Sequence, residues 1–337
     1  MLFNKSDSGI VELKAIIPFI YKSLEFDGLV MDINLAENEI KKLVGTDIYD
    51  LANTFYHSSD YNTPDDSGSS SDKHRGNELL TLLVTKIQLP VALNAYRNYA
   101  ANNLVTHSDK GRQIFVTDTE KPAFEWQIKR DEAALIKKEY ASLDDLILFL
   151  DTYIDYFPEW SQSEAYLVSK ELFINTAKDF DGIYPIDCSR RLFIKICPFI
   201  KEIERKYIRP TISPAVFDNI KVKIKNDSLD ESDTILLQYI QSPLVLLTMS
   251  IAIKRLSIEL LPEGVFQNQY TEAVSLTTKD KADISLRREI SKSLEEEGMQ
   301  ELSRLEFYLK GVTYDSGSEI FDVIPPQPSP SNSFFRV

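Results

Sequence analysis

The sequence contains one hydrophobic pattern twice, and this repetition constrains the fold more than any other feature. Residues 82–91 read LLVTKIQLPV, and residues 235–244 read ILLQYIQSPL. The two prolines are 153 residues apart (243 − 90 = 153), and Gly111 and Gly264 show the same separation. Repeated units often bury their cores against each other. The sequence therefore predicts an internal duplication, with two similar helical halves.

The spacing of apolar residues predicts a mainly α-helical protein with short β segments. Two long apolar helices are expected around Pro90 and Pro243. A kink or break is expected at each proline, because proline removes one hydrogen bond of the helix. Short strands are expected at 113–117 and 265–277, each introduced by a glycine.

Local signals predict where further helices begin and end. Ser142 and Ser161 each stand three residues before an acidic residue and resemble capping boxes. A second-half helix is expected over 190–208, kinked or interrupted at Pro198. The repeat also extends backwards, where Pro18 aligns with Pro198.

These patterns divide the chain into three parts. We expect a first helical repeat at 1–187, a second at 188–322 and an extended Pro-rich tail at 323–337. Closely spaced prolines favour the polyproline II conformation. Phe334 and Phe335 near the end of the tail could dock on a neighbouring subunit; a disordered terminus is the alternative.

Composition limits the possible partners. The net charge of −14 disfavours non-specific binding to nucleic acid, which requires Lys and Arg to replace counterions. Residues 242–253 form the most apolar stretch, which is too short to span a bilayer, so no membrane association is expected.

The two cysteines are too few for a disulfide framework. With only Cys188 and Cys197, we expect free thiols in a reducing compartment.

The sequence predicts no catalytic, cofactor-binding or metal site. His57, His74 and His107 lack a zinc-binding spacing. Asp151 and Asp155 are four residues apart and could share a proton in a cleft, although such pairs more often lie on a solvated helix face. The run at 295–297, three glutamates, is interpreted as a solvated face as well.

Two further groups of side chains suggest contacts. Arg190 and Arg191 stand at a predicted helix start, where positive charge opposes the helix dipole. They indicate either an anionic partner or a simple surface pair. Trp126 and Trp160 are interpreted as core or interface anchors.

Several stretches resemble a family of uncharacterised proteins from phages and prophages of Bacteroidetes gut bacteria. The resemblance rests on FPEW at 157–160 with Ser163, on LFINTA at 172–177, and on the segment from Ser189 through PFI at 198–200 to YIRPT at 207–211. It implies a virion role near the head–tail junction, similar to helical connector proteins that form rings.

Three functions therefore stand as hypotheses. The first is a non-enzymatic structural subunit of a phage or prophage particle, a head–tail connector or ring protein that forms homo-oligomers and contacts other virion proteins. The second is a soluble binding or regulatory module of the bacterial cytoplasm. The third is a hydrolase that uses Asp151 and Asp155. The expected location is the virion or the bacterial cytoplasm.

Overall fold

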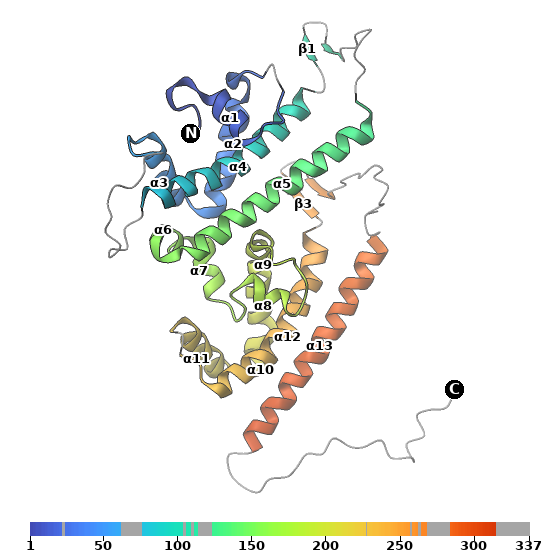
Figure 1. Ribbon diagram of the computed structural model, residues 1–337. Helices are drawn as coiled ribbons and strands as arrows, with labels where there is room; N and C mark the ends of the chain where they lie inside the picture. Colours follow the sequence, from blue (N-terminus) through green and yellow to red (C-terminus); the bar gives the residue numbers. More distant parts are fainter. Residues whose placement is uncertain are drawn as a thin grey trace.

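The computed structural model describes residues 1–21, 24–61, 76–103, 106–108, 111–113, 123–226, 228–256, 258–261, 264–267 and 284–314. The protein is mainly helical, as predicted (Figure 1). Long helices form its frame, and short helical turns connect them. The predicted strand residues 114–117 and 268–277, the polar residues 62–75 and the tail at 323–337 lie outside the described residues.

The N-terminal elements are η1 (Lys5–Asp7), α1 (Gly9–Ile16), η2 (Phe26–Leu29), α2 (Val30–Val44), α3 (Thr46–His57), α4 (Asn77–Asn102), β1 (Thr106–Ser108), β2 (Gly111–Gln113) and α5 (Glu125–Thr152). The connecting elements are η3 (Ile154–Tyr156), α6 (Pro158–Ser161), α7 (Glu164–Lys170) and α8 (Ala177–Asp181). The C-terminal elements are α9 (Arg190–Ile203), η4 (Glu204–Ile208), α10 (Arg209–Ile212), α11 (Pro214–Lys225), α12 (Glu231–Arg255), β3 (Ile258–Leu261), β4 (Gly264–Gln267) and α13 (Ile284–Tyr314).

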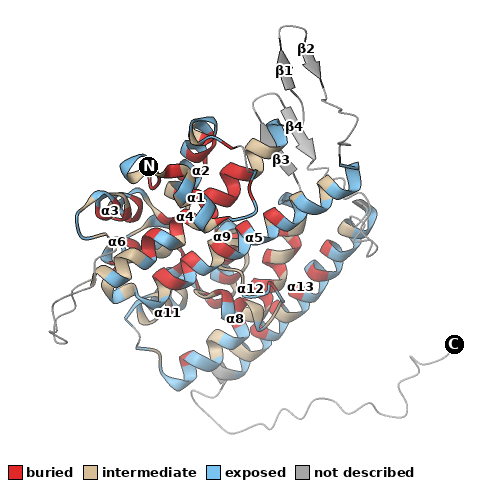
Figure 2. Cartoon of the chain, turned by 45° about the horizontal axis from the view of Figure 1, so that its top comes forward, coloured by how far each residue is buried: buried red, intermediate tan, exposed pale blue. Residues whose placement is uncertain are grey.

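Two hydrophobic cores organise these elements. The first is built around α4, which packs against α2 and α5, and its fully buried side chains lie between residues 2 and 160. The second is built around α12, which packs against α9 and α13. The buried surfaces of these helices face one another (Figure 2). Apart from Ile194, residues up to Tyr166 pack in the first core and residues from Val168 onward pack in the second. The expected domain boundaries at 187 and 322 stay predictions.

Each long proline-containing helix is followed by a short antiparallel hairpin and then by another long helix. Strand β1 pairs with β2, with His107 opposite Arg112. Strand β3 pairs with β4, with Leu260 opposite Val265. The order of helix, hairpin and helix is thus the same for α4 to α5 and for α12 to α13.

The prolines do not interrupt their helices. Helix α4 continues through Pro90, α12 through Pro243 and α9 through Pro198. Pro90 and Pro243 are buried, so packing on both sides of each helix holds the backbone in place where one hydrogen bond is missing. A break at Pro90 or Pro243 is therefore wrong, whereas the kink expected as its alternative stays a prediction. The expected interruption at Pro198 is wrong as well; the π-helical turn η4 begins only after α9 ends at Ile203.

Three local predictions need correction. Helix α5 is continuous through Ser142, whose hydroxyl donates a hydrogen bond to the Glu139 carbonyl at 2.7 Å and caps no helix. The cap of α7 is Ser163, two residues after the expected Ser161; its oxygen accepts from the Tyr166 N–H. Pro18 lies in a turn after α1, unlike Pro198 inside α9, so this pairing fails.

Candidate functional site

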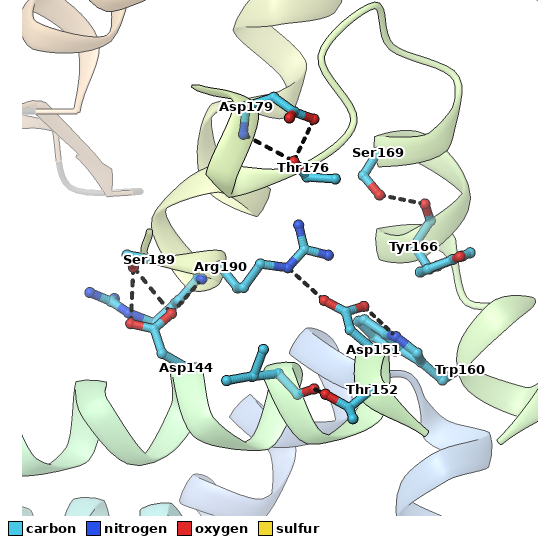
Figure 3. Close-up of polar contacts among 12 residues, drawn as sticks. Asp144, Asp151, Thr152, Trp160, Tyr166, Ser169, Thr176, Asp179, Ser189 and Arg190 are labelled. Atoms are coloured by element: carbon cyan, nitrogen blue, oxygen red, sulfur yellow. Dashed lines mark hydrogen bonds and ion pairs between the residues drawn. The ribbon is translucent and has the colours of Figure 1, made fainter. Parts of the chain in front are cut away.

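The most elaborate polar site lies where α5 meets the start of α9, at the junction between the two cores (Figure 3). The Asp144 carboxylate of α5 accepts the Ser189 hydroxyl at 3.0 Å and the Arg191 backbone N–H at 2.8 Å. The first N–H groups of a helix lack partners within the helix and favour negative charge. Asp144 therefore compensates the two arginines that begin α9.

Arg190 forms the second contact of this junction. Its Nε donates to Asp151 at 2.6 Å, and both side chains are largely buried, with 13% and 22% of their surfaces exposed. The other Asp151 oxygen accepts the Trp160 indole N–H at 3.0 Å. Trp160 is itself fully buried, as its interpretation as an anchor predicted. One carboxylate thus connects α5, α6 and α9 (Figure 3).

Arg191 and its neighbours complete the junction. The Arg191 guanidinium lies 3.5 Å from the centre of the Tyr140 ring, a cation–π distance. Ile194, on the next turn of α9, packs against the first core. Lys195, the next residue of α9, is exposed, and partial desolvation is the main cause that lowers its pKa, followed by the nearby Arg191 charge. The start of α9 therefore contacts α5 through an ion pair, a backbone hydrogen bond and a cation–π interaction, and α9 adds an apolar contact to the first core.

A second type of site holds the backbone of one residue from both sides, and we call it a backbone clamp. In the first clamp, Glu37 accepts the Leu2 N–H at 2.7 Å and the Gln88 side chain donates to the Leu2 carbonyl at 2.6 Å. Glu37 and Gln88 are buried, and Leu2 is completely enclosed. A buried backbone N–H or C=O without a hydrogen bond would cost free energy. The two side chains provide the hydrogen bonds that a neighbouring β-strand would otherwise supply.

The second clamp repeats these contacts in the other core. Glu204 accepts the Phe173 N–H at 2.7 Å, and the Gln241 side chain donates to the Phe173 carbonyl at 3.0 Å. Each clamp glutamine lies two residues before the internal proline of its helix, Pro90 or Pro243. Sequence reasoning missed the clamps, although this shared position of the two glutamines was a signal that could have identified them.

The second clamp also contains a buried cation. Lys221 of α11 donates to Glu204 at 2.7 Å, and the pair is mostly enclosed, with 18% and 4% of the side-chain surfaces exposed. Burial raises the pKa of Glu204 and lowers the pKa of Lys221, in each case against the attraction of its partner. Desolvation thus opposes both charges, which is expected for a buried ion pair.

The two cores differ where their long helices cross. In the first core, Asn94 of α4 donates to Glu139 of α5 at 2.9 Å, and both are buried. In the second core, Leu247 of α12 faces Gly298 of α13, where an added Cβ would lie 2.7 Å from the Leu247 Cγ. Asn94 and Leu247 both stand four residues after the internal proline. One crossing is therefore polar and the other apolar.

The structure separates the predicted carboxylate pair. Helix α5 ends at Thr152, so Asp155 lies on the following turn η3, where it is exposed. Asp151 is occupied by Arg190 and Trp160. Arg190 and the start of α9 therefore find their anionic partners, Asp151 and Asp144, within the same chain.

The remaining sequence candidates are dispersed. His57 lies within 3.1 Å of the Met1 carbonyl, and Trp126 is exposed at the start of α5 rather than buried. The cysteines are free thiols, Cys188 exposed and Cys197 buried. Burial raises the pKa of Cys197 to about 12. Glutamates 295–297 are exposed, as predicted; residue 74 and the side chain of residue 107 lie outside the described part.

Within the described residues, no group of three or more His, Cys, Asp or Glu side chains could hold a metal ion. Helices α4 and α12 are long and apolar enough to cross a membrane by length and composition. Their most apolar windows are 61% and 50% buried inside the fold, which is common for core helices of soluble proteins.

Together these features define a mainly helical protein with two cores, an ionic junction and a backbone clamp in each core. The chain belongs to the family of unknown function DUF6712, whose model matches residues 40–169 and 208–316, more than half of the chain. Neither the curated proteins nor the solved structures contain a match.

Proposed function

We propose that the chain is an internal duplication of two similar helical halves. The two backbone clamps support this most directly, because Gln88 and Gln241 show the same separation of 153 residues (241 − 88 = 153) as the internal prolines. The repeated order of helix, hairpin and helix adds support. So do Gly45 and Ser213, which link consecutive helices with similar backbone angles, φ 93° and ψ 151° against φ 72° and ψ 148°.

We further propose that this protein is a non-enzymatic structural subunit of a phage or prophage particle, a head–tail connector or ring protein. The observation that carries the proposal is that the charged side chains at the junction bind each other and hold α5 against α9. Asp144, Asp151 and Arg190 all join α5 to α9, so they build a rigid two-part unit. A subunit of a ring needs such rigidity, since small changes of angle would prevent closure.

The net charge suits this role. A protein with a net charge of −14 repels the phosphates of DNA, so it could surround a DNA channel without gripping the DNA. The proposed partners are further copies of this chain and other virion proteins, with no specific binding to nucleic acid and no membrane association. The resemblance to phage and prophage proteins, carried by the segments around 157–163, 172–177 and 189–211, supports the virion as its location.

Two measurements on the full-length chain test the proposal. Mass photometry over a range of concentrations should show one discrete oligomer besides the monomer, and negative-stain electron microscopy should show closed rings. Cryo-electron microscopy of purified particles should place the chain at the head–tail junction. A strict monomer that is absent from particles would contradict the proposal.

The alternative is a soluble binding or regulatory module of the bacterial cytoplasm. The neighbouring genes distinguish the two, because portal, terminase and capsid genes favour a virion subunit and a metabolic operon favours the alternative. If the chain is an enzyme that uses Asp151, the variant Asp151→Asn should lose an activity. If Asp151 has a structural role, the same variant should lose stability.

A further inference from the structure

A stacked pair of tyrosines lies at the surface of the second core, with Tyr239 exposed and Tyr308 half-buried. Tyr239 of α12 and Tyr308 of α13 have ring centroids 4.4 Å apart and an interplanar angle of 17°. Tyr239 is 41% exposed, and Ile235, one turn earlier on α12, is 40% exposed. We call Ile235, Tyr239 and Tyr308 the tyrosine platform. Contiguous exposed apolar surface of this kind often marks a binding site.

The pairing of a proline-containing helix with the next long helix does not by itself require the tyrosine platform. In the first core, the residue four positions before the internal proline is Lys86, which forms an ion pair with Asp145 of α5. The corresponding position before Pro243 is Tyr239. The same pairing of long helices is therefore built with an ion pair in one core and with stacked aromatic rings in the other.

The chain itself contains a segment with matching chemistry. After α13 ends at Tyr314, the sequence continues to VIPPQPSP at 323–330. Pro-rich segments favour polyproline II, a conformation that binds surfaces lined by aromatic side chains with little loss of entropy. We propose that the tyrosine platform binds this Pro-rich segment of the same chain.

Chain length permits the contact. Tyr314 lies about 9 Å along the helix from Tyr308. Residues 315–322 span at most about 28 Å when extended, so the segment can return to the platform. A tether of this length gives an effective concentration of order mM, which favours the segment of the same chain over that of a free second copy. The contact does not depend on the proposed virion role.

Disulfide trapping in the full-length chain tests the proposal. In a Cys188→Ser background, Ile235→Cys is combined with Gln327→Cys, which lies between two prolines of the segment. The control combines Gln327→Cys with Leu82→Cys. Leu82 stands eight residues before Pro90, as Ile235 does before Pro243, and is similarly exposed, 45% against 40%. After mild oxidation, we expect a faster-migrating monomer on non-reducing gels for the 235–327 pair and severalfold less for the control.

The tyrosines should determine the yield. Tyr239→Ala should reduce trapping by about 2- to 10-fold, the equivalent of a typical aromatic contact. Tyr239→Phe keeps the ring and should trap as well as the parent. Equal yields for the 235–327 and 82–327 pairs would overturn the proposal. A disulfide-linked dimer would overturn the assignment to the same chain, because the segment would then come from a second copy.

Discussion

Replacing Gly298 with alanine tests how closely α12 and α13 approach each other. A Cβ at position 298 would lie 2.7 Å from the Leu247 Cγ, 2.8 Å from its Cδ2 and 3.2 Å from its backbone nitrogen. Both distances to the side chain are shorter than a normal contact, and the backbone nitrogen cannot rotate away. Gly298→Ala therefore requires α13 to shift, and overpacking of this kind costs about 1–3 kcal/mol.

The same substitution has an opposite effect from helix propensity. Alanine is favoured over glycine inside a helix by about 1 kcal/mol. Gly311, on the same helix, has no atom within 4 Å of an added Cβ and is exposed, so Gly311→Ala isolates that gain. We expect Gly311→Ala to stabilise the protein by up to about 1 kcal/mol, with Gly298→Ala about 2 kcal/mol less stable than this control.

Urea unfolding followed by far-ultraviolet circular dichroism measures both variants. A double-mutant cycle with Leu247→Ala identifies the partner, because removal of the Leu247 side chain should relieve part of the cost, with a coupling of about 0.5–3 kcal/mol. If Gly298→Ala stabilised the protein as much as Gly311→Ala does, the close approach of the two helices would be refuted.

Three further predictions concern the junction and the clamps. Arg190→Leu should destabilise the protein by about 3 kcal/mol in urea unfolding, because Asp151 would remain as a buried charge without its partner, and Asp151→Asn should relieve part of this cost. Gln88→Ala and Gln241→Ala should each cost about 1–3 kcal/mol, since each leaves a buried carbonyl unpaired; a negligible cost for either would contradict its clamp. The raised pKa of Glu204 means that the folded protein binds an extra proton just above pH 4.5, so the unfolding free energy should decrease as pH rises there, and a urea–pH series should show a smaller decrease in Glu204→Gln.

Apolar periodicity was sufficient to predict the mainly helical fold and the two long helices around Pro90 and Pro243. The same apolar periodicity did not show that both helices continue through their prolines. Proline and serine signals describe what the local backbone prefers, and a buried helix packed on several sides overrides that preference. Ser142 shows the same effect, since it is buried in the middle of α5 and not at a helix start.

The polar contacts were less predictable than the helices. The arginine pair at 190–191 indicated either an anionic partner or a simple surface pair. Nothing in the sequence identified the carboxylates of α5, which lie 39 and 47 residues earlier in the chain. The clamps were accessible in principle, because Gln88 and Gln241 occupy the same place in both repeated segments. Their function depends on Leu2 and Phe173, whose burial follows only from tertiary packing.

The proposed duplication also suggests why no third repeat packs against α13 in the described part of the chain. Helix α5 uses Asp144, Ile147 and Asp151 on the side that receives α9. An offset of 159 residues relates Leu146 to Leu305, both fully buried (305 − 146 = 159), and it places exposed Ser303 and Glu306 of α13 where α5 has Asp144 and buried Ile147. A polar outer face is the usual end of a repeat stack. These two polar positions suggest that α13 would close the proposed two-half unit, so that the proposed ring would form through exposed apolar surface instead. Exposed apolar side chains are present on α2, with Met31 at 65% and Leu35 at 54%, and on α13, with Phe307 at 67% and Met299 at 43%, and their burial would provide the hydrophobic driving force for such a contact.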